Sequence, residues 1–392
     1  MNILDHNLSP YLSKLSQVNS SEELKRLPEY QRIEPEVHRI LSSVLQRNQV
    51  KPAPDEPGPI RVSGWNVERG TYLEGIIDTL KSHPIMREND VYALTELDYG
   101  MARSQNKRVP EELADALDLN FAFAPCYINL EKGSGLESNV DGHNELGLHG
   151  NAILSKYPIL GAHSVIIPNG KDKMCGKEKR LGSQNAVIAI IDHPQGKFRV
   201  VSVHLDAHST QKHRAYQMEL VLNDLDRFHP ELPALIGGDW NTSTYNSRNA
   251  FFSIMGYVRR VLMGVRHVIR DHHPYPDRWF ERHLFRLLEN RGYGYKDLNE
   301  PGGCTLHYDV KDLAANGRMA DWIPNWCFWF INWALEKNDG KCSMKLDWFA
   351  GKDIVPALDN PPKVIQDAND PSQPLSDHDP IFLEFNLSQK VS

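Results

Sequence analysis

The chain has 392 residues, of which 40% are hydrophobic and 24% are charged, and this balance excludes wholesale disorder and collagen-like or low-complexity character. Its 44 basic and 51 acidic residues give a formal net charge of −7. The protein is therefore not a strongly basic nucleic-acid binder of the histone kind, although a local basic patch would still allow a nuclease. At about 150 residues per domain, the length favours two or three domains or one large α/β or β-sandwich enzyme.

Cysteine usage and hydropathy bear on the location of the protein. The five cysteines are scattered and form no CxxC pair, which argues against a disulfide framework and favours a reducing compartment. The N-terminus lacks the basic lead and apolar core of a signal peptide. No window reaches the roughly 18 apolar residues of a membrane span. The sequence therefore predicts a cytoplasmic protein without a transmembrane segment, free or in peripheral contact with a membrane.

The N-terminal part is polar. Apolar residues at three-and-four spacing predict a short amphipathic helix over 35–48. The segment KPAPDEPGP at 51–59 has four prolines in nine residues and predicts an extended linker. We therefore expect an N-terminal helical arm and linker over 1–59 and a catalytic domain over 60–392.

From residue 60 onward, short apolar runs rich in Val, Ile, Leu or Phe alternate with loops, as is typical of buried strands. These runs lie within 59–67, 90–97, 150–159, 185–192, 198–206, 233–241, 342–351 and 379–387. Helical patterns cover 71–82 and 210–228. Long helices between buried strands predict a layered α/β protein.

Residues 251–340 interrupt this pattern with little strand character. Apolar residues between 258 and 269 line one helical face, and most of the charge on that helix lies off this face. Its basic residues are Arg259, Arg260, Arg266 and Arg270. Tryptophans follow at spacings of four, three and four, at Trp322, Trp326, Trp329 and Trp333. We expect a helical insert whose apolar stripes form a core of their own, although a basic amphipathic helix can also lie on an anionic bilayer.

Residues that bind metals or move protons stand at the ends of the predicted strands. They are Asn66, Glu68, Glu96, His204, Asp239, Asn241, Asp347, Asp377 and His378. Singly, several of them are ordinary turn residues. Carboxylate and amide oxygens are hard ligands that suit Mg²⁺ or Mn²⁺. A metal, a carboxylate and a histidine together can neutralise a phosphate ester, activate water and stabilise the leaving oxygen, so the set predicts phosphate-ester hydrolysis.

The ordered segments WNVE, TE, HGNAILSKYPI, VSVHL, GGDWN, LDWF and SDHDP resemble the endonuclease/exonuclease/phosphatase superfamily, which has the deoxyribonuclease I-like fold. The resemblance covers about 60–250 and 343–387. It implies a four-layer α/β sandwich, in which two packed mixed β-sheets are flanked by helices, here with a helical insert at about 251–340.

The resemblance also implies roles for individual residues. The metal-binding candidates are Glu96, Glu68, Asn66 and Asp377. The catalytic candidates are Asp239, His378, His204, Asn241 and Asp347. The substrate-binding candidates are Asn66, Asn151 and Arg180. Asp239 would orient or deprotonate the attacking water, and Asp347 would hold the imidazole of His378 in one tautomer.

The sequence departs from the family pattern in two places. Some members place a second carboxylate beside the first catalytic histidine, whereas the matching segment LHGNAIL offers His149 and Asn151 with no evident acid. Many members carry an arginine early in the next strand, where this chain has SQNAVIA. Arg180, in a basic loop at 171–180, would substitute for that arginine.

We therefore expect a metal-dependent phosphoesterase in which water attacks a phosphodiester in line. Nucleic acid is the favoured substrate, because WNVE resembles the abasic-endonuclease branch. The aromatic, arginine-bearing insert argues for the alternative of a phospholipid or sphingomyelin phosphodiesterase, or an inositol-phosphate phosphatase. A binding module on a degenerate fold is the non-enzymatic alternative, and the intact residue set argues against it.

Overall fold

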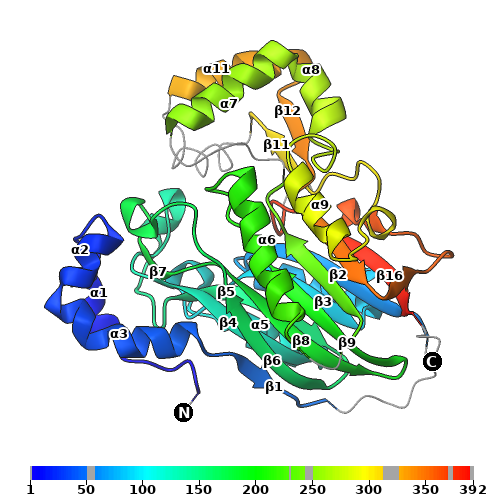
Figure 1. Ribbon diagram of the computed structural model, residues 1–392. Helices are drawn as coiled ribbons and strands as arrows, with labels where there is room; N and C mark the ends of the chain where they lie inside the picture. The colour runs from blue at the N-terminus through cyan, green and yellow to red at the C-terminus, as the bar shows by residue number, and fades with distance from the viewer. Residues whose placement is uncertain are drawn as a thin grey trace.

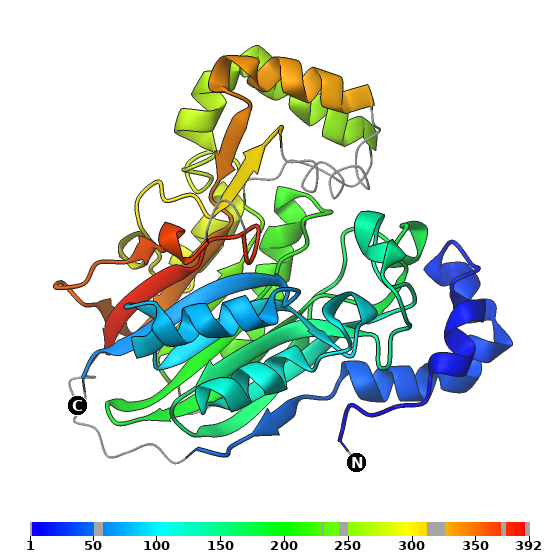
Figure 2. The ribbon, with the colours of Figure 1, turned by 180° about the vertical axis from the view of Figure 1, so that it is seen from behind.

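The computed structural model describes residues 2–50, 58–228, 231–242, 250–311, 326–369 and 374–388. Two large β-sheets lie face to face with helices on their outer faces, and a small third sheet rises from one end of this sandwich toward a further group of helices (Figures 1 and 2). This is the four-layer α/β sandwich that the sequence predicts.

The first large sheet has the strand order β1-β4-β5-β3-β2-β16-β14, with β7 beside β4 and β15 beside β16. Its strands are β1 (Leu45–Arg47), β2 (Ile60–Arg69), β3 (Val91–Tyr99), β4 (Asn120–Asn129), β5 (Leu148–Ser155), β7 (Arg180–Gly182), β14 (Ile354–Pro356), β15 (Lys363–Val364) and β16 (Ile381–Leu387). Strands β2 and β3 run parallel and the other pairs antiparallel, so the sheet is mixed.

The second large sheet has the order β13-β10-β9-β8-β6. Its strands are β6 (Ile159–Ile166), β8 (Asn185–His193), β9 (Gly196–Val203), β10 (Ala234–Asp239) and β13 (Asp347–Lys352). Strands β9 and β10 are parallel, so this sheet is mixed as well. The third sheet is an antiparallel pair of β11 (Leu306–Asp309) and β12 (Lys341–Met344), with α11 (Trp326–Leu335) between them in the sequence.

Helices cover both outer faces of the sandwich. Near the first sheet lie α1 (Ser9–Leu15), α2 (Ser21–Arg26), α3 (Pro28–Leu41), α4 (Leu73–Ser82) and α5 (Val109–Leu117). Over the second sheet lie α6 (Gln211–Leu225) and α9 (Arg282–Asn290). The elements α7 (Ala250–Met263), α8 (Val265–His267), a π-helical turn at Val268–His272 and α11 (Trp326–Leu335) stand above the third sheet (Figure 1).

Three apolar clusters hold the four layers together. The first packs α1–α5 on the first sheet and includes Trp65 and Phe121. The second fills the space between the two sheets and includes Phe349 and Phe385. The third packs α6 and α9 on the second sheet and includes Phe285. Burial of these apolar faces, at about 25 cal/mol per Å², is the main force that aligns the strand ends of the two sheets.

Some elements differ from the sequence prediction. The helix expected over 35–48 is α3, which begins at Pro28, a residue favoured in the first helical turn, and ends at Leu41. Residues 45–47 instead extend the first sheet as β1, which pairs with β4. The linker residues 51–57 lie outside the described residues, as does Trp322. The expected insert is only partly helical, because it contains β11, and its helix α9 belongs to the third apolar cluster of the sandwich.

The arm is held to the sandwich by packing and pairing rather than standing apart. Leu4, Leu15 and Leu24 are buried in the first apolar cluster.

Within the described part of the chain, no helix combines the length and the apolar composition that crossing a bilayer requires.

His193 makes the stability of the fold pH-dependent. Its ring is 5% exposed and packs edge-on against Tyr157, with ring centroids 4.4 Å apart. Burial lowers the pKa of His193 to about 4, from an ordinary value of 6.5. Between these two pH values the unfolded chain binds a proton at His193 and the folded chain does not. The contribution of neutral His193 to the free energy of unfolding is therefore complete above pH 6.5 and is lost as the pH falls toward 4. At pH 5 the loss amounts to about 2 kcal/mol.

Urea denaturation of the wild-type protein and of His193→Phe at pH 7 and pH 5 checks this expectation. Phe keeps the aromatic packing against Tyr157 but cannot be protonated. The drop in unfolding free energy between the two pH values should therefore be smaller in the variant by about 2 kcal/mol. An equal drop in both proteins would contradict the assignment of this titration to His193.

Candidate metal centre and active site

The ends of four central strands bring the predicted site residues together. In the first sheet, Asn66 lies near the end of β2 and Glu96 lies on β3, the strand parallel to it. In the second sheet, His204 directly follows β9 and Asp239 ends β10, and these strands are also parallel. Because parallel strands end at the same edge of a sheet, both pairs point their functional side chains out of one end of the sandwich.

The backbone is unusual where these side chains leave the strands. Glu68, Glu96 and Asn241 have φ angles of 43°, 59° and 52°, in the left-handed region that residues with a Cβ seldom adopt. Glu96 also lies where the register of β3 against β5 shifts between Leu94 and Leu97. Such bulges redirect a side chain, and strained residues persist where the surrounding structure holds them, commonly at functional sites.

The backbone conformation of Gly238 explains why glycine directly precedes Asp239. Its φ is 130°, and a Cβ at this position would lie 2.3 Å from the carbonyl oxygen of Val203. Only glycine allows the end of β10 to approach β9 so closely. This approach brings Asp239 beside His204, so the GGD motif has a steric basis in addition to its turn character.

Asn66, Glu96, Asp239 and His204 form a compact polar cluster. The Asn66 amide donates hydrogen bonds to Glu96 Oε1 at 3.0 Å and to Asp239 Oδ2 at 3.2 Å. His204 Nε2 lies 3.4 Å from Asp239 Oδ2, and its Nδ1 lies 3.9 Å from Glu96 Oε1. Asn241 donates through its amide to the Leu205 carbonyl at 2.9 Å and lies 3.1 Å from His204 Nε2.

His378 approaches the same cluster from the segment before β16. Its Nδ1 lies 2.7 Å from Asp347 Oδ2, and its Nε2 lies 3.8 Å from Asp239 Oδ2. Thr305 donates its hydroxyl to Asp347 Oδ2 at 2.5 Å. The carboxylate of Asp347 is thus fixed from two sides and holds the imidazole with Nε2 turned toward Asp239. The structure therefore brings together all five residues predicted to be catalytic.

Burial and mutual charge set the protonation of the cluster. Burial raises the pKa of Glu96, but Arg69, His204 and His149 outweigh it, so this carboxyl is ionised well below neutral pH. Burial raises the pKa of Asp239, which remains higher than ordinary despite His378 and His204. Burial opposes protonation of His378, but Asp347 and Asp239 raise its pKa well above the ordinary value. The cluster thus combines the ionised carboxylate of Glu96, the carboxylate of Asp239 with its raised pKa, and the imidazolium of His378.

The sequence segment around His149 predicts no acidic residue beside this histidine, and this prediction is wrong. Asp98 lies opposite His149 in the antiparallel pair of β3 and β5, and its Oδ1 lies 2.8 Å from His149 Nδ1. Asp98 follows Glu96 by two residues, so alternation along β3 could have pointed to it. Burial lowers the pKa of His149 even though Asp98 opposes this effect.

A buried ion network lies beyond His149. Arg103 donates to both oxygens of Asp98, at 2.8 and 2.9 Å, and to Glu178 Oε1 at 2.8 Å. Glu178 also accepts from Arg180, a predicted substrate-binding residue. Arg69 bonds Glu137 at 2.9 Å and lies 3.7 Å from Glu96. The strand-end pattern could not point to Arg69 or Arg103, because their partners Glu137 and Glu178 come from loops that are distant in the sequence.

Three predicted residues lie at the margin of the cluster. Glu68 accepts a hydrogen bond from the backbone N–H of Asp377 at 3.0 Å, and the side chain of Asp377 is exposed. The buried amide of Asn151 donates to the carbonyl oxygen of Asn185 at 3.0 Å and to Cys126 Sγ at 3.4 Å. The role of Glu68 and Asp377 in metal binding and that of Asn151 in substrate binding therefore stay predictions.

The donor atoms of the cluster suit a divalent cation. Among the described residues, ligand atoms of Glu96, His204 and Asp239 all lie within 4.8 Å of one another, as do those of Asp239, Asp347 and His378. Asp347 Oδ1 is buried and lacks a hydrogen-bond partner, so one hard acceptor at the cluster is unsatisfied. Carboxylate oxygens with an imidazole and no thiolate are a donor set for Mg²⁺ or Mn²⁺.

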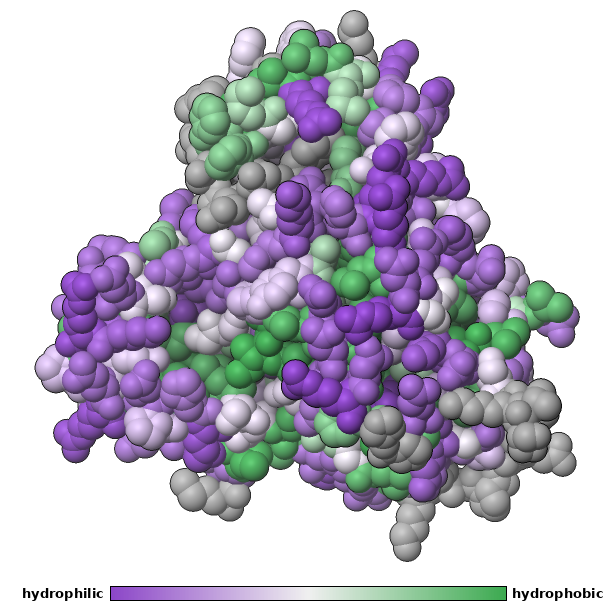
Figure 3. Space-filling view, viewed as in Figure 1, coloured by the Kyte–Doolittle hydropathy of each residue, from purple (hydrophilic) through white to green (hydrophobic). Residues whose placement is uncertain are grey.

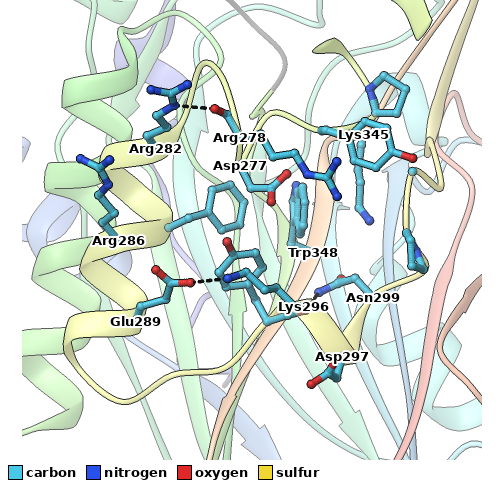
Figure 4. A pocket seen from close by; sticks show the side chains of 16 residues that line it. Asp277, Arg278, Arg282, Arg286, Glu289, Lys296, Asp297, Asn299, Lys345 and Trp348 are labelled. Carbon is cyan, nitrogen blue, oxygen red and sulfur yellow. Dashed lines mark hydrogen bonds and ion pairs between the residues drawn. The ribbon is translucent and has the colours of Figure 1, made fainter. Parts of the chain in front are cut away.

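A cavity lies on the other side of β13 and is separate from this cluster. It has a volume of about 570 Å³ and is lined by α9, the segments on either side of it and the end of the loop before β13 (Figure 4). Lys345 and Trp348 belong to its wall. Neighbouring residues of a strand point to opposite faces, so Trp348 faces this cavity while Asp347 faces His378.

Comparisons with known proteins found one matching protein family and several similar solved structures. A model of the Endonuclease/Exonuclease/phosphatase family matches residues 64–334, which is more than half of the chain. No curated protein sequence matches it. Among solved structures, the chain is similar to an endonuclease/exonuclease/phosphatase from Beutenbergia cavernae, with 16% identity, a TM-score of 0.46 and coverage of 84% of this chain and 72% of that chain.

Two further structures have comparable similarity. One is D. rerio TDP2 complexed with single strand DNA product, with 13% identity, a TM-score of 0.45 and coverage of 84% of this chain and 99% of that chain. The other is the human Nocturnin catalytic domain with bound sulfate anion, with 13% identity, a TM-score of 0.45 and coverage of 88% and 98%. On the family match over residues 64–334, the chain belongs to the endonuclease/exonuclease/phosphatase family, whose members are phosphoesterases.

Proposed function

We propose that this protein hydrolyses a phosphodiester with the help of a divalent cation, Mg²⁺ or Mn²⁺. The observation that carries the proposal is the cluster at one end of the sandwich, in which the amide of Asn66 links Glu96 to Asp239 and His378 approaches Asp239. A single phosphoryl group can touch all of these side chains at once. Substrate orientation of this kind is a large part of phosphoryl-transfer catalysis.

Glu96 is the principal candidate for holding the cation. It is ionised, and its Oε1 shares the Asn66 amide with Asp239 Oδ2. Rotation of this amide would turn an oxygen ligand toward the two carboxylates. A bound divalent cation would neutralise phosphate charge and lower the barrier to attack by water.

The remaining residues divide the work of proton transfer and charge stabilisation. Asp239 has a raised pKa, which suits a general base that orients and deprotonates the attacking water near neutral pH. His378 is held as a cation by Asp347 and faces the same space, where it stabilises negative charge on the phosphoryl oxygens. His204 and Asn241 lie beside Asp239 and supply hydrogen bonds to the same group.

The proposal is tested with bis-p-nitrophenyl phosphate, a soluble diester. We expect hydrolysis in the presence of Mg²⁺, complete loss of activity with EDTA, and recovery when excess Mg²⁺ is returned. Hydrolysis that persists in EDTA would contradict metal dependence. No hydrolysis of this or any nucleic-acid or lipid diester in Mg²⁺ or Mn²⁺ would instead favour a binding module.

The identity of the diester is a second question. Nucleic acid is the class that the segment WNVE favours. However, the arginines nearest the cluster are engaged: Arg69 pairs with Glu137, and Arg103 and Arg180 share Glu178. Affinity for a nucleic-acid backbone depends on cations that are available to phosphates.

A phospholipid diester is the second candidate, because the insert presents exposed apolar side chains on α7 and α11, above the third sheet, and this sheet begins beside the cluster. Thr305, directly before β11, bonds Asp347, and Leu306, the first residue of β11, bridges to His378. A panel of plasmid DNA, abasic DNA, RNA, sphingomyelin and phosphoinositides, each with Mg²⁺ and with EDTA, separates the two classes. We also propose the cytoplasmic location that the scattered cysteines of the sequence favour.

A further inference from the structure

The outer surface of the insert is apolar. Six large side chains on α7 and α11 are 43% to 82% exposed, and we call them the apolar cap: Phe251, Phe252, Met255, Leu262, Trp329 and Trp333. Figure 3 shows apolar surface gathered over this end of the molecule. Single exposed apolar residues are ordinary, whereas a group of six on two helices that stand side by side indicates a surface with a partner.

Packing inside the insert does not account for the cap. The inner side of α7 and its continuation already contributes Ile254, Tyr257 and Ile269 to a small cluster with Tyr308 and Leu335. The cap residues lie on the other sides of the same helices. A helix that is apolar on its inner and its outer side requires an apolar environment beyond the fold.

The charged residues on α7 and α11 are basic. Residues 250–270 contain four arginines and no acidic residue, and residues 326–335 of α11 contain no charge. Arg259 and Arg266 are exposed. Arg270 is exposed as well and is paired with Asp271 at 2.9 Å. Apolar and tryptophan side chains flanked by arginines match an anionic bilayer, whose acyl region takes the apolar groups and whose headgroups attract the cations.

We propose that the apolar cap docks this protein on the surface of an anionic phospholipid bilayer. The inference rests on the proposed phosphodiesterase function and names its partner and its substrate class, a phospholipid diester. The insert that carries the cap is anchored at the catalytic cluster, because Thr305 bonds Asp347 and the backbone N–H of Asp379 donates to the Thr305 carbonyl at 2.7 Å. Docking therefore holds the cluster close to the headgroup layer.

Vesicle flotation of the full-length protein tests the docking. Vesicles of phosphatidylcholine alone are compared with vesicles that also contain phosphatidylserine. We expect the wild-type protein to float with the second kind only. Leu262→Ser combined with Trp329→Ser should abolish flotation. Arg259→Gln and Arg266→Gln should each weaken it by about fivefold, since a basic residue near an anionic surface contributes about 1 kcal/mol of binding.

Leu358→Ser is the matched control. Leu358 is 95% exposed and lies between β14 and β15, away from the insert, so its loss should leave flotation unchanged. All variants should keep the wild-type rate on soluble bis-p-nitrophenyl phosphate. That assay separates the two proposals. Flotation without hydrolysis of the diester would contradict the proposed function alone. Hydrolysis of the diester without flotation would contradict the docking alone.

Three other outcomes would also overturn the docking. Flotation that survives the double cap variant would show that another surface binds the vesicles. Light scattering that reveals a wild-type dimer, converted to a monomer by the cap variant while vesicles bind neither, would assign the cap to a second copy of this chain. Mg²⁺-dependent nicking of plasmid DNA without flotation would return the substrate to nucleic acid.

Discussion

Asp239→Asn should lower kcat/KM for the diester by about 10³-fold, the range typical for loss of a general base. The amide keeps the size and the hydrogen-bonding reach of the carboxylate but cannot accept the proton of the attacking water. It also removes a donor atom from the group of ligand atoms formed with Glu96 and His204. Both effects act on the transition state, so kcat should fall more than KM rises.

The same substitution should leave the protein folded. Burial raises the pKa of Asp239, and the nearby Asp347 raises it further, which means that a negative charge at this position is destabilising. Replacing it by a neutral amide should therefore leave the melting temperature measured without metal unchanged or raised. Asp192→Asn, at an exposed position of β8, is the matched control and should keep full activity. Near-wild-type turnover by Asp239→Asn on the physiological substrate would rule out this residue as the base.

Asp347→Asn should lower kcat by about 10³-fold as well, through His378 rather than by contact with the substrate. Asp347 holds Nδ1 of His378 at 2.7 Å and is the main group that raises the pKa of this imidazole against the effect of burial. Without the carboxylate, the ring loses its fixed orientation and its positive charge. Loss of the carboxylate partner of a catalytic histidine costs about 10⁴-fold in the well-studied serine proteases.

A pH–rate profile distinguishes this positioning role from a structural defect. If cationic His378 is the active form, activity is lost as the pH rises through its pKa. Asp347→Asn lowers that pKa, so the alkaline limb of the profile should move to lower pH. Thr305→Val, which removes the hydroxyl donated to Asp347, should cause a smaller loss of kcat. A uniform loss of rate with an unchanged alkaline limb would contradict the role assigned to Asp347.

The layered fold could be predicted because its strands are buried and its helices periodic. Helices α4 and α6 lie within the ranges expected from apolar spacing alone. Strand β4 lies outside the predicted runs, and the proline in its middle, Pro125, is unusual for a central strand. The structure accommodates this proline next to an irregularity, where the register against β5 shifts between Pro125 and Tyr127.

The candidate site shows where sequence reasoning ends. Residue types at strand ends identified Glu96, Asp239 and His378, because the chemistry of phosphate transfer requires them wherever they lie in the chain. Asp98 was missed although it lies two residues after Glu96 on the same strand. Thr305 could not be found, since its bond to Asp347 depends on how the insert returns to the sandwich. The apolar cap could not be predicted either, because the sequence does not show which side of α7 packs inside the insert.

Anomalous diffraction from crystals grown with Mn²⁺ tests most directly whether the clustered side chains hold a divalent cation. A manganese peak within coordination distance of Glu96, at the position enclosed by Asn66 and Asp239, is expected in the wild-type protein and should vanish in Glu96→Gln. Manganese bound only elsewhere, or a peak that survives Glu96→Gln, would contradict the metal-dependent chemistry proposed for this protein.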